Sequence, residues 1–212
     1  MTTTIAVTDA IKSINEAESR FNLSRTNDLN FFKEWQENLP ELTTAEQETL
    51  DRIKNSYLYN SADGAITEAT VNLLLISPLL YLAGFCDPPF KLRAEKSVEI
   101  AVEEVDEIYR GRIDTLVLKN LFWLTLIESK QTKFSFSVAI PQALAYMMAN
   151  PNPEQPTFGL VTNGDNFIFL KLVKKPVAQY DLSTDFSIFA RPHNELYEVL
   201  RVMKRIGTEI AP

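Results

Sequence analysis

The chain has 212 residues, of which 45% are hydrophobic and 23% charged, a composition typical of a globular domain large enough to bury most of its apolar surface. A single cysteine, Cys86, excludes an internal disulfide and a multi-cysteine zinc site, and a single histidine, His193, argues against a histidine-based metal cluster. The formal net charge of -7 argues against tight, non-specific binding to a nucleic-acid backbone. It does not exclude a nuclease, because the acids of a metal site are themselves negative.

The sequence also predicts where the protein works. Its first residues show no basic, apolar, small-residue leader. The most apolar stretch, Val71 to Phe85, contains Asn72 and a Ser77-Pro78 break, and it is too short to cross a bilayer. We therefore expect a buried helix there and no membrane partner, and the single Cys86 favours a reducing, cytoplasmic location.

The first sixty residues are predicted to be helical and free of strands, forming an extension (1–60) packed on a core domain (61–212). One helix is expected after Thr8, a second after Asn27 or Asp28, and a third after the capping-box sequence Thr44-Ala45-Glu46-Gln47. A fourth helix is expected from about Thr67 to Gly84, after an Asp63-Gly64 turn.

The pattern then changes to strands. Apolar residues alternate from Val98 to Val102, and two further apolar segments hold Asp114 and Glu128. A helix is expected to begin at Pro141 and cover 142–149, followed by two strands, 158–162 and 167–173, around an Asn163-Gly164 hairpin turn. An amphipathic helix closes the chain. This order predicts the α/β class, an α/β/α sandwich around one mixed sheet.

The most informative feature is a group of charged residues in two neighbouring apolar segments. Asp114 lies inside the run 112–118, and Glu128-Ser129-Lys130 ends the run that begins at Leu121. Buried acids are costly unless they are paired or bind metal. Asp114, Glu128 and the Ser129 carbonyl offer oxygen ligands to Mg²⁺ or Mn²⁺, and Lys130 can orient the attacking water or stabilise the charge on an attacked phosphate. The pattern favours phosphodiester hydrolysis.

This hypothesis makes a geometric demand. Glu128 and Lys130, two apart on a strand, share a sheet face. Asp114 can share that face only if the turn between the strands has an odd number of residues, centred on Leu121, or if the ladder carries a bulge.

Other residues can support the site, although each has an ordinary interpretation. Glu68 can reach it from the start of the long apolar helix, but is also a typical first-turn acid. Gln142 and Tyr146 share one helix face and can hold a phosphate or the carboxylates, but also fit a surface amide and a half-buried aromatic residue. Glu-x-Lys alone is a common surface pattern.

Together these residues resemble the PD-(D/E)xK nuclease superfamily. Asp114 stands for the first acid, with Ile113 where proline often lies, Glu128-Ser129-Lys130 matches (D/E)xK, and Gln142-Ala143-Leu144-Ala145-Tyr146 matches QxxxY.

More narrowly, Thr67 to Val173 resembles the N-terminal nuclease domain of type I restriction enzyme R subunits. The shared features are the Glu68 helix ending in Pro78-Leu79-Leu80 and Gly84, the Glu-x-Lys strand, and Phe158-Gly159-Leu160-Val161-Thr162-Asn163-Gly164. The whole chain is similar to compact stand-alone restriction endonuclease-like proteins of cyanobacteria.

The resemblance implies a restriction endonuclease-like fold and a Mg²⁺-dependent endonuclease acting on DNA, with Asp114, Glu128 and Lys130 as its core and Glu68 and Gln142 in support. The chain departs from R subunits because it has no G-x-x-x-x-G-K-[ST] phosphate loop and no candidate target-recognition region. We therefore expect weak DNA binding by the isolated chain and a protein partner for any target recognition, and a homodimer stays open. The alternative is a nuclease-fold binding or regulatory module that does not cut. A nuclease for RNA or branched DNA is a weaker third hypothesis.

Overall fold

The computed structural model describes residues 3–102, 107–119, 122–128 and 136–210 of the chain. It has the mixed α/β architecture that the sequence predicts. Before the long sheet strands come β1 (Thr3–Ala6), α1 (Val7–Ala10), α2 (Ile14–Phe21), β2 (Ser24–Arg25), a 3₁₀ turn η1 (Lys33–Trp35), α3 (Thr44–Ser61), α4 (Glu68–Val71), a π-helical turn η2 (Asn72–Ile76) and α5 (Ser77–Leu82). They are followed by β3 (Lys91–Val102), β4 (Glu107–Lys119), β5 (Phe122–Glu128), α6 (Phe136–Met148), β6 (Thr157–Thr162), β7 (Asn166–Val173), β8 (Gln179–Leu182), β9 (Phe186–Ser187) and α7 (Leu196–Ile210).

The described strands form one mixed sheet, in the order β1-β4-β5-β6-β7-β8-β2, with β3 added on β4 and β9 on β7. Strands β3, β4 and β5 are an antiparallel meander, whereas β5 and β6 are parallel. A parallel pair needs a crossover, and α6 supplies it. The C-terminal ends of β5 and β6 therefore lie side by side, with Glu128 in register with Thr162.

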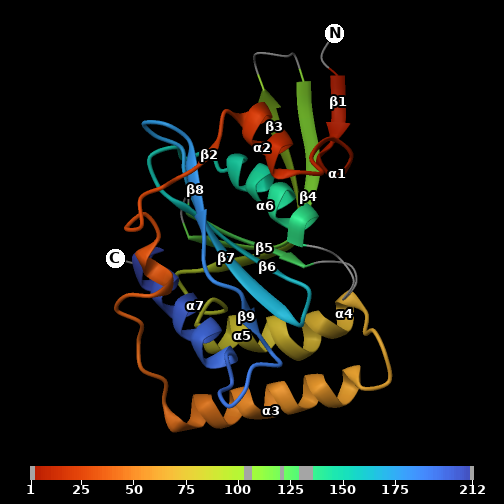
Figure 1. Ribbon diagram of the computed structural model, residues 1–212, viewed down its shortest axis with the longest axis vertical. Helices are drawn as coiled ribbons and strands as arrows, with labels where there is room; N and C mark the ends of the chain where they lie inside the picture. The colour runs from red at the N-terminus through yellow and green to blue at the C-terminus, as the bar shows by residue number, and fades with distance from the viewer. Residues whose placement is uncertain (1–2, 103–106, 120–121, 129–135, 211–212) are drawn as a thin grey trace.

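Helices cover both faces of the sheet (Figure 1). On one face α3, α5 and α7 bury a cluster with the strand residues Val117, Phe158, Leu160, Phe167 and Phe169, which we call the α5-side cluster. On the other face α1, α2 and α6 bury the α6-side cluster, whose strand residues include Tyr109, Ile113, Leu116, Val161, Leu170 and Leu172. Membership of a cluster shows which face of the sheet a strand residue occupies, for the residues named in either cluster.

The N-terminal segment differs from the helical extension expected. Thr3–Ala6 and Ser24–Arg25 are strands of the same sheet, paired in parallel with β4 and β8. The helix expected after Thr8 is wrong in its start: Thr8 lies inside the short helix α1, which follows Ala6. Ser13 instead caps a second helix, α2, by accepting a hydrogen bond from the Glu16 backbone N–H.

The helix expected after Asn27 or Asp28 is only the 3₁₀ turn η1. Asp28 accepts a hydrogen bond from the backbone N–H of Asn30, which makes a turn instead of a helix cap. Lys171 then holds the segment against β7, donating to the Phe31 carbonyl at 2.8 Å and to the Glu34 carboxylate at 2.6 Å.

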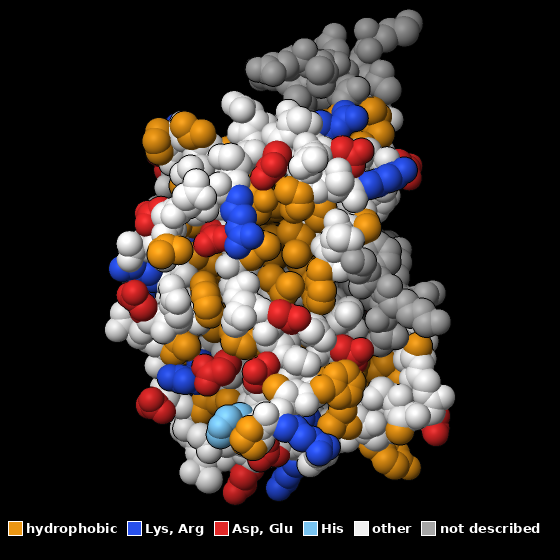
Figure 2. Space-filling model, in the orientation of Figure 1, with side chains coloured by type: hydrophobic (Ala, Val, Ile, Leu, Met, Phe, Trp, Pro, Cys, Tyr) orange, Lys and Arg blue, Asp and Glu red, His pale blue; other side chains and the backbone are white. Residues whose placement is uncertain are grey.

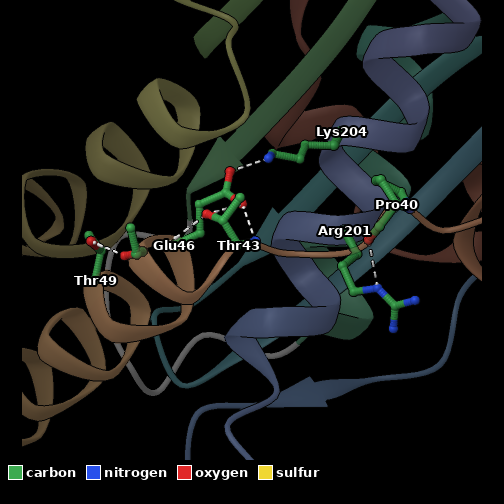
Figure 3. A network of polar contacts seen from close by, with 7 residues as sticks. Pro40, Thr43, Glu46, Thr49, Arg201 and Lys204 are labelled. Carbon is green, nitrogen blue, oxygen red and sulfur yellow. Dashed lines mark hydrogen bonds and ion pairs between the residues drawn. The ribbon is translucent and has the colours of Figure 1, made fainter.

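The third helix is confirmed, with its cap one residue earlier than expected. Thr43 and Glu46 form a full capping box at the start of α3. Figure 3 shows the same Glu46 carboxylate reaching Lys204 of α7, while Arg201 donates to the Pro40 carbonyl at 3.0 Å. These contacts join the start of α3 to the C-terminal helix.

Helix α6 begins at Phe136, five residues before the expected start at Pro141. Proline inside a helix removes one backbone hydrogen bond. The burial of every residue from Ala139 to Met147 outweighs that loss, because the helix lies between the sheet and α2. The hairpin of β6 and β7 and the amphipathic helix α7 are confirmed. None of the helices within the described ranges is long and apolar enough to span a bilayer.

Candidate functional site

The hairpin of β4 and β5 sets the relation between Asp114 and Glu128. Lys119 pairs with Phe122, so an even number of residues, two, separates the paired ends of the strands, whereas the sequence hypothesis required an odd number. The last described pair is Thr115 with Leu126, which leaves Asp114 one residue and Glu128 two residues beyond it. In a regular ladder of this register the two positions would occupy opposite faces.

Strand β4 is not regular at this point. Ile113 and Leu116 both belong to the α6-side cluster, although residues three apart on a regular strand face opposite ways. Val117 follows on the α5 side. The alternation is therefore interrupted at Asp114–Thr115, where the half-buried Asp114 lies. The neighbouring β3–β4 ladder keeps the same register on both sides of this point, so no extra residue is inserted there, and the bulge in the β4–β5 ladder that the sequence allowed stays a prediction.

Strand β3 is interrupted opposite the same point. Glu95 has a φ of 51°, the left-handed conformation that non-glycine residues rarely adopt. The ladder passes from the pair Ala94–Thr115 to the pair Lys96–Ile113 without pairing Glu95 with Asp114. Leu92 accordingly packs on the α5-side cluster, whereas Val98 belongs to the α6-side cluster.

The position of Glu128 is fixed through β6. Its backbone is in register with Thr162, two residues after Leu160 of the α5-side cluster. The side chain of Glu128, and Ser129 and Lys130 entirely, lie outside the described residues, so their predicted roles stay predictions.

The turn after Thr162 is built by side chains. Thr162 Oγ1 accepts from the Gly164 N–H at 3.0 Å, and Asn163 Oδ1 accepts from the N–H groups of Asp165 and Asn166. Gly164 has a φ of 88°, and a Cβ there would lie 2.6 Å from the Tyr57 hydroxyl oxygen, so only glycine fits without a shift. The sequence Thr162-Asn163-Gly164 thus has a structural role, because its side chains and its glycine form the turn at the end of β6.

Tyr57 and Asp165 are a pair that the sequence did not predict. The buried Tyr57 hydroxyl donates to Asp165 Oδ1 at 2.7 Å. Burial, together with the hydrogen bond to Asp165 and its charge, raises the pKa of Tyr57 well above its ordinary value. The two residues are 108 positions apart, and the only local signal was an acid next to an Asn-Gly turn.

Glu68 lies at the start of α4, where Thr67 caps the helix by accepting from the Thr70 N–H. Glu68 is half-buried, and the π-helical turn η2 follows the end of α4 at Val71. Helix α4 continues through η2 into α5, so Glu68 lies on the α5 side of the sheet, the side that Leu160 also faces.

Gln142 comes from the opposite side. It is buried in α6, and its side-chain amide donates to the Ile11 carbonyl at 3.4 Å. Tyr146, one turn later, covers Gly111 of β4, where an added Cβ would lie 2.2 Å from its ring. Helix α6 thus contacts β4 three residues before Asp114, but Gln142 and Glu68 belong to helices on opposite faces.

Carboxylate oxygens are the ligands that Mg²⁺ and Mn²⁺ prefer, so the donor types of Asp114, Glu128 and Glu68 fit such an ion. Among the residues that the structure describes, no three His, Cys, Asp or Glu side chains form a metal-binding group. The carboxylate of Glu128 is not among those side chains. No family model matches the sequence, and no curated protein is significantly similar to it.

Proposed function

We propose that the protein is a metal-dependent endonuclease of the PD-(D/E)xK type that hydrolyses phosphodiester bonds in DNA. The observation that supports this most is the simultaneous interruption of β3 and β4 at Glu95 and Asp114. Breaking the alternation there frees Asp114 to face the α5 side, the side on which alternation from Leu160 and Thr162 would place Glu128.

Each residue has one role in this proposal. Asp114, Glu128 and the Ser129 carbonyl would hold the metal, and Glu68 would approach from α4 as a further ligand. Bound Mg²⁺ or Mn²⁺ supplies an acidified water and offsets phosphate charge. Lys130 would place its ammonium beside the attacked phosphate, where charge develops during hydrolysis. Gln142 has no metal-binding role in this proposal, because its helix lies on the α6 side and its amide donates to the Ile11 carbonyl.

The second candidate is a nuclease-fold binding or regulatory module that does not cut. Two observations favour it. The Gln142 amide already bonds the Ile11 carbonyl, which takes it away from a substrate role. Lys and Arg side chains are scattered among acids on the face drawn in Figure 2, and the net charge is -7, so attraction for a phosphate backbone is weak. A protein partner would then supply target recognition.

A cleavage screen separates the two candidates. Wild type and Glu128→Ala are incubated at low salt with Mg²⁺ or Mn²⁺ and with single-stranded, double-stranded and branched DNA, and with RNA. Cutting of DNA by wild type alone supports the endonuclease. A wild type that binds metal but cuts none of these nucleic acids supports the module, and equal cutting by both proteins indicates a contaminating nuclease.

A further inference from the structure

A cavity of about 290 Å³ opens between the C-terminal end of α3 and the turn that joins β6 to β7. Its wall is formed by Leu58, Ser61, Ala62, Ala65, Asp165 and Phe189, together with the backbone of Gly64. The volume is about ten times the share of one water molecule in the liquid and approaches the lower limit for small-ligand pockets. The lining contains one carboxylate and no basic side chain.

The carboxylate of this cavity is held in place. Tyr57 donates to Asp165 Oδ1 at 2.7 Å, and the Asp165 backbone is fixed on both sides, by Asn163 Oδ1 at its N–H and by the Ile188 N–H at its carbonyl. Asp165 Oδ2 makes no hydrogen bond with a described residue. The cavity thus presents a preorganised acceptor, which reduces the entropy lost on binding.

An aromatic ring lies at the edge of the same cavity. Phe189 is 56% exposed, so its side chain is open to a ligand. Its backbone N–H donates to Ser187 Oγ, which helps to fix the segment that presents the ring. Leu58, Ala62 and Ala65 give the remaining wall a small, apolar surface.

We propose that this cavity binds a guanidinium group. A guanidinium ion is planar and weakly hydrated, so it can lie on the Phe189 ring while its N–H groups donate to Asp165. A phosphate or carboxylate ligand would instead be repelled by Asp165. The guanidinium belongs either to a small free compound or to an arginine side chain of a partner protein. This inference does not depend on the proposed nuclease activity.

The test measures binding to the full chain without metal or nucleic acid. Methylguanidinium and the peptide acetyl-Gly-Arg-Gly-amide are titrated into ¹⁵N-labelled protein, with acetyl-Gly-citrulline-Gly-amide as the neutral control. We expect saturable shifts at Asp165, Phe189 and Ala65 for both cations and none for the citrulline peptide. Tighter binding of the arginine peptide identifies a partner side chain as the source, and tighter binding of methylguanidinium identifies a free compound.

Two variants and one control make the test specific. Asp165→Asn, whose amide oxygen can still accept from Tyr57, should weaken binding about tenfold or more. Phe189→Ala should weaken it by about fivefold. Tyr81→Ala, which removes an exposed aromatic ring outside the cavity, should leave it unchanged. Equal affinity for the arginine and citrulline peptides, or unchanged binding in a folded Asp165→Asn protein, would overturn the proposal.

Discussion

Ile113 and Leu116, three residues apart on one strand, both pack in the cluster beneath α6. A regular strand cannot do this, because its side chains alternate between faces. The interruption lies at Asp114–Thr115, and the left-handed Glu95 lies opposite on β3. The alternation of side chains between the two sheet faces is therefore interrupted in β3 and β4 at the same point, which is the position of Asp114.

Gly164 provides a test of the turn after β6. Gly164→Ala should destabilise the protein by about 1 kcal/mol through its positive φ, and by about 1–3 kcal/mol more through contact with the Tyr57 hydroxyl. Urea unfolding measures the change. Gly84→Ala is the matched control, because its φ is 79° and an added Cβ there meets no atom within 4 Å.

The Tyr57 contact can be isolated further. Adding Tyr57→Phe to Gly164→Ala removes the hydroxyl nearest the new Cβ, so the double variant should lose less stability than the two single changes predict together. If the losses of stability in the two single variants simply add, the contact between the new Cβ and the Tyr57 hydroxyl does not cause the destabilisation.

Glu46 predicts a pH dependence of the joint between α3 and α7. Burial alone would raise the pKa of Glu46, but hydrogen bonds from Lys204 and Thr43 and the Lys204 charge hold it below its ordinary value of 4.5. A folded-state pKa below the unfolded one adds stability above the unfolded pKa and loses it as the pH falls through the folded pKa. The stability advantage of wild type over Glu46→Gln should therefore be full near neutral pH and should decline as the pH falls below 4.5 through the lower folded-state pKa.

Denaturant unfolding between pH 3 and 7 measures this difference. Glu48→Gln, an exposed acid on the same helix, is the control and should show a much smaller change with pH. A Glu46→Gln difference that stays constant over the whole range would contradict the role given to the Lys204 contact.

Divalent metal should raise the melting temperature of the wild type more than that of Asp114→Asn. A ligand that binds only the folded state stabilises it by mass action, and the metal also relieves repulsion between the Asp114 and Glu128 carboxylates. Differential scanning fluorimetry with Mn²⁺ measures the shift, with Glu48→Gln as a control for general loss of negative charge. Equal shifts in wild type and Asp114→Asn would argue against metal at this position.

Glu128→Ala and Lys130→Ala should abolish cleavage without unfolding the protein. The first removes a metal ligand and the second removes a cation facing the developing phosphate charge, so either change should lower the rate by orders of magnitude. Circular dichroism and urea unfolding establish that both variants fold. Loss of cutting accompanied by unfolding would assign these residues to structure instead of chemistry.

Local signals in the sequence predicted much of the fold. The β6–β7 hairpin followed from an Asn-Gly turn between apolar runs, and α3 from its capping box. Strands β1 and β2 were missed because they are four and two residues long and are held by distant partners, β4 and β8. Segments that short carry no periodicity of their own.

The candidate site was predictable only as a set of residue types. Asp114 and Glu128 were found because they are acids within apolar runs. The interruption beside Asp114 lies opposite the left-handed backbone of Glu95, 19 residues earlier in the chain. The residues around Glu95 are ordinary strand residues and give no sign of that conformation. The Tyr57–Asp165 pair joins residues 108 positions apart, and an acid next to an Asn-Gly turn does not by itself name its partner.

The most direct test of the nuclease proposal is a crystal structure of the protein with Mn²⁺, in which anomalous scattering locates the ion. The proposal predicts one strong peak within coordination distance, about 2.0–2.6 Å, of carboxylate oxygens of both Asp114 and Glu128, with the Lys130 amine beside it. Asp114 and Glu128 on opposite faces of the sheet, with no manganese between them, would contradict it.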